Sequence, residues 1–152
     1  MTLHILVVED NSSKAEQIIQ TVKFHYDVQP EWVPTISGAY AVLEYKQWDL
    51  VILDMTFQVS QGLGQAVRKE ALAGIELLQY MSAKRLYFPV IVATQHDFFR
   101  QGGWVNIESV DDLHKMLTAA FPKQYRAVVH VDMASSDWQI ELMKTMRRII
   151  NV

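Results

Sequence analysis

Cysteine is absent from the 152-residue chain, so neither a disulfide framework nor a thiolate metal site can form. No apolar run approaches the roughly 20 residues that a membrane-spanning helix needs. The first ten residues also lack the basic start of a signal peptide. No internal repeat, low-complexity tract or linker rich in proline, glycine or serine interrupts the chain. We therefore expect a cytoplasmic protein that has no membrane partner.

Acidic residues slightly outnumber basic ones: the chain has 17 Asp and Glu and 14 Lys and Arg, so its formal net charge is −3. A chain that binds nucleic acid through its phosphates is normally basic, so direct nucleic acid binding is not expected. Hydrophobic residues make up 50% of the chain, and a chain of this length can bury roughly 70% of its unfolded surface. These features favour one domain over residues 1–152, with no separate output domain.

Short apolar segments alternate with amphipathic ones along the chain. Four of the apolar segments are rich in β-branched residues, which is typical of strands buried on both faces of a parallel sheet. They cover residues 3–8, 50–53, 89–93 and 127–131. A weaker strand is predicted where Val28, Pro30 and Trp32 alternate. Proline cannot donate to a strand ladder, so this strand is expected at a sheet edge.

Helical spacing of apolar residues fills the intervals between these strands. The predicted helices begin near residues 13, 37, 74, 109 and 136, and the second of them runs to about residue 46. A serine followed three residues later by an acid or amide marks three of the starts: Ser13 with Glu16, Ser109 with Asp112, and Ser136 with Gln139. The five β-α repeats predict a flavodoxin-like (βα)5 sandwich, with helices on both faces of a parallel five-stranded sheet in the order 2-1-3-4-5.

Three acidic residues follow the first and third predicted strands. Glu9 and Asp10 end the first strand, and Asp54 ends the third. In the order 2-1-3-4-5 these two strands are neighbours at the switch point where ligands bind. Three carboxylates in one cleft repel one another unless a cation lies among them, and an all-oxygen ligand set suits Mg²⁺. The alternative is that these acids only cap the helices that follow them.

Four motifs, in this order, resemble a response-regulator receiver domain, and the resemblance spans most of the chain. They are ILVVEDN (5–11), VILDM (51–55), GIELL (74–78) and PVIVAT (89–94). The resemblance implies that Asp54 is the phosphoacceptor and that Glu9 and Asp10 hold Mg²⁺, with the Thr56 backbone carbonyl as a further ligand. It also implies that Thr94 contacts the phosphoryl group, although a β-branched residue is ordinary in a strand. A histidine kinase or phosphotransfer protein is the implied phosphodonor, and an unidentified output protein is the second partner.

The last strand departs from the family's pattern, which ends in a lysine followed by a proline. This chain has AVVHVDM (127–133), with no lysine between Lys123 and Lys144. His130 is the nearest replacement, and an imidazole could donate one hydrogen bond to a phosphoryl oxygen. The alternative is that His130 packs in or near the strand.

Two connections are longer than the ~2–6 residues usual for this kind of fold. The insertion near residues 57–73 lies directly after the expected acceptor and is interpreted as a lid or a partner-binding loop. The insertion near residues 96–108 carries aromatic residues, which form either a binding surface or an extension of the core.

Three functions are compatible with these features. The first is a stand-alone receiver in which Mg²⁺-dependent phosphorylation of Asp54 switches a protein–protein interaction, with homodimer formation as one form of output. Such a module is not an enzyme beyond its own phosphorylation and slow dephosphorylation. The second is a pseudo-receiver that binds its partner constitutively, which the missing lysine favours. The third is a Mg²⁺-dependent phosphohydrolase, which is disfavoured because Thr56 stands where haloacid-dehalogenase-type enzymes have a second acid.

Overall fold

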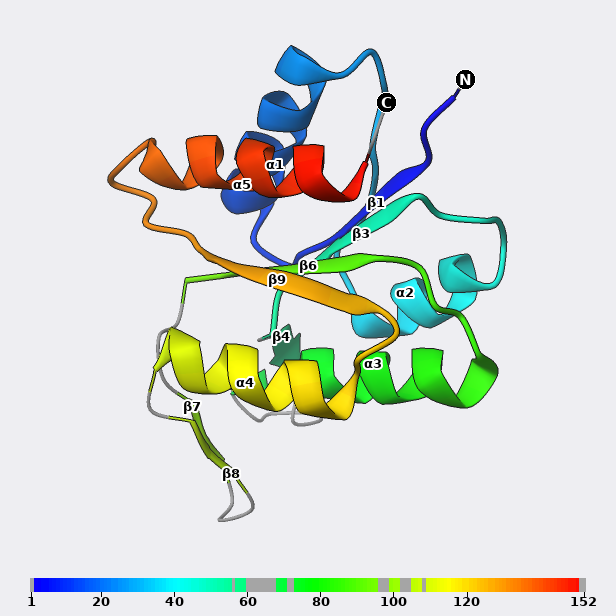
Figure 1. Ribbon diagram of the computed structural model, residues 1–152, viewed down its shortest axis with the longest axis vertical. Coiled ribbons are helices and arrows are strands. Elements are labelled where there is room, and N and C mark those ends of the chain that lie inside the picture. Colours follow the sequence, from blue (N-terminus) through cyan, green and yellow to red (C-terminus); the bar gives the residue numbers. More distant parts are fainter. Residues whose placement is uncertain are drawn as a thin grey trace.

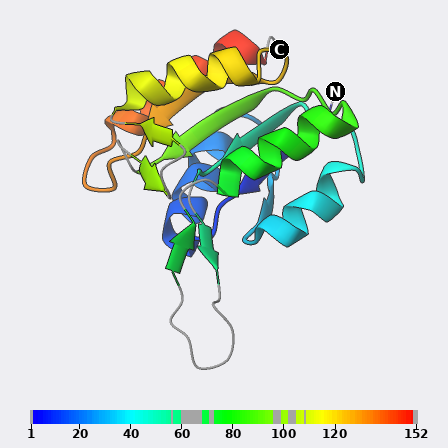
Figure 2. The same cartoon turned by 90° about the horizontal axis from the view of Figure 1, so that it is seen from below.

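The computed structural model describes residues 2–55, 57–59, 68–70, 73–95, 99–101, 105–107 and 109–150. Thr56 lies outside these residues, and so does much of the two predicted insertions. The described parts of the insertions form two short antiparallel hairpins. β4 (Phe57–Val59) pairs with β5 (Arg68–Glu70), and β7 (Phe99–Gln101) pairs with β8 (Val105–Ile107). Figure 2 shows the hairpin of β4 and β5 standing out from the body of the sheet and helices.

A parallel sheet of five strands runs through the centre of the molecule, in the order β2-β1-β3-β6-β9. Its strands are β1 (Ile5–Val8), β2 (Glu31–Val33), β3 (Leu50–Leu53), β6 (Val90–Thr94) and β9 (Tyr125–His130). Numbered by appearance within this sheet, the order is 2-1-3-4-5, so the predicted topology is confirmed. The weak second strand lies at the edge as expected, but it begins after Pro30 rather than before it. Every residue of β1, β3 and β6 is buried, because layers of helix cover both faces.

Five helices form these two layers. α1 (Ser12–His25) and α5 (Asp137–Ile149) cover one face, and α2 (Ile36–Leu43), α3 (Ala73–Lys84) and α4 (Val110–Ala120) cover the other (Figure 1). The core is accordingly divided in two by the sheet, and each half joins alternate strand residues to one helical layer. None of the described helices has the length and apolar character needed to cross a bilayer. α2 ends at Leu43, three residues before the predicted end at residue 46.

Of the three predicted serine caps, those of Ser13 and Ser136 do not form. The N-cap of α1 is Asn11, whose side chain accepts a hydrogen bond from the Lys14 amide at 2.9 Å, so Ser13 lies inside the helix. Asparagine is among the best N-cap residues, and here it directly follows the acids at the end of β1. Ser136 does occupy the N-cap of α5, but its backbone is not extended (ψ 0°) and its hydroxyl makes no capping hydrogen bond. The Ser109 cap of α4 is confirmed by its hydrogen bond from the Asp112 amide at 3.0 Å.

Candidate functional site

Backbone hydrogen bonds fix the acids at the carboxyl edge of the sheet. The Glu9 amide donates to the Val33 carbonyl of β2 at 3.2 Å, and the Asp54 amide donates to the Val8 carbonyl of β1 at 3.0 Å. Each bond extends a parallel ladder by one residue beyond the end of the strand. The Trp32 indole also donates to the Glu9 backbone carbonyl at 2.7 Å. The backbone at the end of β1 is therefore held from the neighbouring strand β2.

The structure brings the three predicted acids together. Glu9, Asp10 and Asp54 each offer a carboxylate oxygen, and these oxygens lie within 4.8 Å of one another. Glu9 and Asp54 are buried, and Asp10 is half-buried. This arrangement is the acid cluster on which the remaining site is built.

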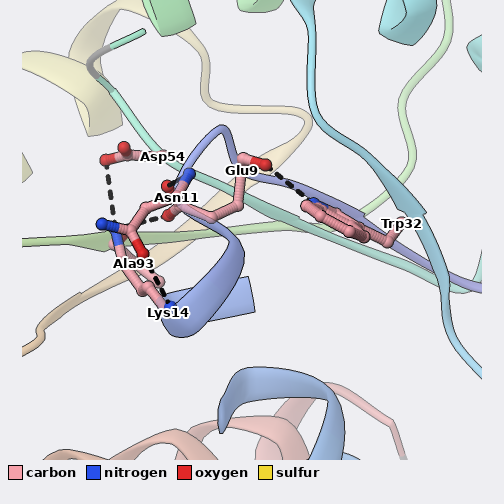
Figure 3. Close-up of polar contacts among 6 residues, drawn as sticks. All are labelled: Glu9, Asn11, Lys14, Trp32, Asp54 and Ala93. Atoms are coloured by element: carbon pink, nitrogen blue, oxygen red, sulfur yellow. Dashed lines mark hydrogen bonds and ion pairs between the residues drawn. The ribbon is translucent and has the colours of Figure 1, made fainter. Parts of the chain in front are cut away.

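A buried lysine completes the acid cluster, and the sequence analysis missed it. The Lys14 ammonium lies 2.6 Å from Glu9 Oε1 and 3.3 Å from Asp54 Oδ1, and it donates to the Ala93 backbone carbonyl at 2.8 Å (Figure 3). Its side chain is 0% exposed. One signal was available in the sequence: Lys14 precedes the buried Ile18 and Thr21 of α1 by four and seven residues, so it lies on the buried face of that helix.

The net charge of the acid cluster is suited to binding a divalent cation. With all groups ionised, three carboxylates and one ammonium carry a formal charge of −2, and all the carboxylate donors are oxygens. The pKa of Glu9 is raised to about 7, first by burial and second by Asp54, and the Lys14 ammonium offsets only part of this rise. The residues present thus fit Mg²⁺ in charge and in donor type.

Thr94 and His130 occupy neighbouring strand ends at the same edge. Thr94 is buried at the end of β6 and pairs in register with His130 at the end of β9. The His130 side chain is exposed, and its Nε2 lies 3.1 Å from the Gln95 backbone carbonyl. His130 therefore contacts the residue that follows β6. A phosphoryl contact by His130 stays a prediction.

The start of α3, in the other helical layer, packs against the backbone of Asp54 and Met55. The Gly74 amide donates to the Met55 carbonyl at 3.1 Å. A Cβ atom on Gly74 would come within 2.7 Å of the Asp54 backbone carbonyl and 2.7 Å of Met55 Cε. Only glycine allows α3 to approach the end of β3 this closely, so Gly74 helps to set the position of Asp54.

Several solved structures with the same architecture are described as receiver or response regulator domains. The signal receiver domain of a protein described as a LuxO repressor from Vibrio parahaemolyticus is 20% identical, with a TM-score of 0.65 over 98% of this chain and 93% of that one. A CheY-like receiver domain protein from Methanospirillum hungatei is 15% identical, with a TM-score of 0.63 over 97% of this chain and 93% of that one. The response regulator domain of CheB from Thermotoga maritima is 15% identical, with a TM-score of 0.65 over 100% of this chain and 98% of that one.

These likenesses establish the fold: the chain has the flavodoxin-like architecture of CheY-like receiver domains. No family model and no curated protein matches the sequence. What the site does must therefore be argued from its own residues.

Proposed function

We propose that this chain is a receiver module of two-component or phosphorelay signalling, in which Asp54 accepts a phosphoryl group and thereby switches a protein–protein interaction. The convergence of Glu9, Asp10 and Asp54 at the switch point of a receiver fold carries this proposal. An apolar strand end has no need of three carboxylates with oxygens within 4.8 Å of one another, because their repulsion destabilises the fold. Such a cluster is retained more readily where it binds a cation and positions a reacting group.

The roles of the residues follow from their positions. Asp54 is the nucleophile, because it lies at the centre of the edge and is held rigidly between β1 and the start of α3. Glu9 and Asp10 would hold Mg²⁺ together with Asp54, and Thr94 would bind a phosphoryl oxygen from the end of β6. When bound, Mg²⁺ orients the incoming phosphoryl group and neutralises part of its charge. The chain's own contribution is mostly the placement of charge and hydrogen-bond donors around Asp54.

The donor in the cell is proposed to be the phosphohistidine of a histidine kinase or phosphotransfer protein, and a further protein receives the signal. None of the described helices could span a membrane, and the full chain has a formal net charge of −3. We propose that both partners are proteins, with a second copy of this chain as one candidate partner. Residues 1–152 are proposed to act as a single domain.

The test is incubation with acetyl phosphate and Mg²⁺, followed by intact mass. The wild-type protein should gain the mass of one phosphoryl group, in an acid-stable and alkali-labile linkage, and Asp54→Asn should gain none. Asp49→Asn is a matched control, because Asp49 contacts the His4 amide away from the acid cluster. If Asp54→Asn were still labelled, another residue would be the phosphoacceptor.

A pseudo-receiver is the second candidate, and one observation favours it. Lys14 already pairs with Glu9 and Asp54, so a side chain of the protein itself supplies a cation to the acid cluster. A constitutive binding module would use this ion pair only for stability. It would bind the same partner with equal affinity before and after treatment with acetyl phosphate, and no label would appear at Asp54.

A further inference from the structure

Lys14 is a fully buried cation that the proposed function leaves without a role. Lysine is almost never fully buried unless it is paired. In this structure its ammonium donates a hydrogen bond to the Ala93 carbonyl and forms ion pairs with Glu9 and Asp54 (Figure 3). The ammonium is thus held by groups from the ends of β1, β3 and β6, three neighbouring strands of the sheet.

Helix stability does not explain a lysine at this position. Lys14 lies in the first turn of α1, where the helix dipole places positive partial charge and disfavours a cation. Neutralising one acid does not explain all the contacts of Lys14 either, because the 2.6 Å ion pair with Glu9 would be enough to neutralise one carboxylate. The ammonium reaches further, to the carboxylate that is proposed to react and to the strand that ends in Thr94.

We propose that Lys14 is the phosphoryl-binding cation of this site, supplying from α1 the ammonium that the receiver pattern has at the end of the last strand. The inference rests on the proposed function of Asp54. Ala93 immediately precedes Thr94, and β6 lies between β3 and β9 in the sheet. The ammonium therefore lies on the side of Asp54 that faces Thr94 and β9. That is the side from which a last-strand lysine would reach the same carboxylate.

The reaction in this step is the transfer of a phosphoryl group from an acyl phosphate. An Asp54 carboxylate oxygen attacks phosphorus, an O–P bond forms, and the bond between phosphorus and the donor's carboxylate oxygen breaks. The donor carboxylate leaves with the electron pair, so nothing is oxidised or reduced. The Asp54 carboxylate loses its formal negative charge, the departing donor carboxylate carries one away, and the transferred phosphoryl group brings its own negatively charged oxygens beside Asp54. Lys14 then donates to one of these oxygens with the N–H that now faces Asp54.

The three distances in the structure suit this exchange. The ion pair with Glu9 (2.6 Å) and the hydrogen bond to Ala93 (2.8 Å) are short, whereas the ammonium lies 3.3 Å from Asp54. Glu9 and Ala93 anchor the ammonium, and the weaker third contact is the one that a phosphoryl oxygen replaces.

The first experiment compares initial rates of labelling by acetyl phosphate with Mg²⁺ present, followed by intact mass. Lys14→Met and Lys14→Gln should each label about 10- to 100-fold more slowly than wild type, the effect of losing one charge-assisted contact in the transition state. Lys23→Met is the matched control, because Lys23 is an exposed lysine of the same helix, and it should label at the wild-type rate. In the Lys14→Met background, His130→Lys should restore part of the rate, because His130 stands beside Thr94 at the end of β9.

The second experiment needs no variant, so it holds even if the Lys14 variants fold poorly. Beryllofluoride, an acyl-phosphate mimic, is added with Mg²⁺ to wild-type protein labelled with ¹⁵N at the lysine ammonium groups. The Lys14 resonance should shift while that of Lys23 stays in place.

The outcomes separate this inference from the function on which it rests. Normal labelling of Lys14→Gln, or an unshifted Lys14 resonance with the mimic bound, overturns the role of Lys14 and leaves Asp54 as a phosphoacceptor. Absence of any label or mimic binding in the wild-type protein overturns the proposed function, and the role of Lys14 falls with it.

Discussion

Loss of Lys14 should destabilise the metal-free protein strongly and in a pH-dependent way. Lys14→Met removes the ammonium from between Glu9 and Asp54, both of which are buried. Removing one partner of a buried ion pair typically costs about 3–5 kcal/mol, because the remaining charges are left without compensation. For a domain of this size, that corresponds to a fall in Tm of about 6–20 °C.

The pH dependence follows from the pKa of Glu9, which is raised to about 7 even with Lys14 present. Lys14 lowers this pKa, so Lys14→Met raises it further and Glu9 takes up a proton more readily. At about pH 5.5 Glu9 is mostly protonated in both proteins and loses little when the ammonium is removed, whereas at about pH 8 Glu9 is mostly ionised in the wild type and its ion pair is lost in the variant. The destabilisation should therefore be larger at the higher pH.

Urea unfolding at the two pH values measures this difference, with Lys23→Met as the exposed-lysine control. Added Mg²⁺ should recover more stability in Lys14→Met than in wild type, because the cluster then carries one more negative charge. A loss below about 1 kcal/mol at the higher pH, the range of an exposed pair, would show that the buried ion pair does not form in solution. If Lys14→Met lost the same free energy of unfolding at both pH values, the raised pKa of Glu9 would not be the cause of the pH dependence.

Three further predictions concern the acids and the close approach of α3. In the metal-free wild-type protein, Glu9 binds more protons in the folded than in the unfolded state between its ordinary pKa of 4.5 and about 7. The free energy of unfolding should therefore fall as the pH rises through this range. In Glu9→Gln, urea unfolding should show a smaller dependence of this free energy on pH. Mg²⁺ should raise the Tm of wild type, while Asp10→Asn should raise the metal-free Tm by relieving repulsion and should weaken the response to Mg²⁺; identical melting of all four samples would argue against the metal site. Gly74→Ala should cost about 1–3 kcal/mol in urea unfolding, because its Cβ meets the Asp54 carbonyl and Met55 at 2.7 Å, and it should slow labelling of Asp54. Wild-type stability and labelling in Gly74→Ala would mean that α3 does not set the position of Asp54.

Much of the fold could be predicted because its signals are local in the sequence. Apolar β-branched runs specify strands buried on both faces, and their alternation with amphipathic segments specifies a parallel sheet between two helical layers. The acids were predictable for the same reason. Glu9, Asp10 and Asp54 directly follow strands, and parallel strands that are neighbours end at one edge.

The details of the helix starts were less predictable, because serine, asparagine and aspartate compete for the same capping role within one short turn. Asn11 caps α1 where Ser13 was expected, and the hydroxyl of Ser136 does not cap α5. The backbone geometry at the turn decides which side chain reaches the free amides, and the sequence pattern does not contain that geometry.

The sequence by itself determined the layers, the order of the strands and the carboxylates at the switch point, because each depends on residues adjacent in the chain or on a general rule of chain connection. Only the tertiary structure decided the place of Lys14. Along the chain it is a lysine in a first helical turn, but in the fold its ammonium meets a carbonyl 79 residues away and the carboxylate of Asp54. The role of a buried charge depends on the groups that surround it in space. Here those groups lie at the ends of three different strands.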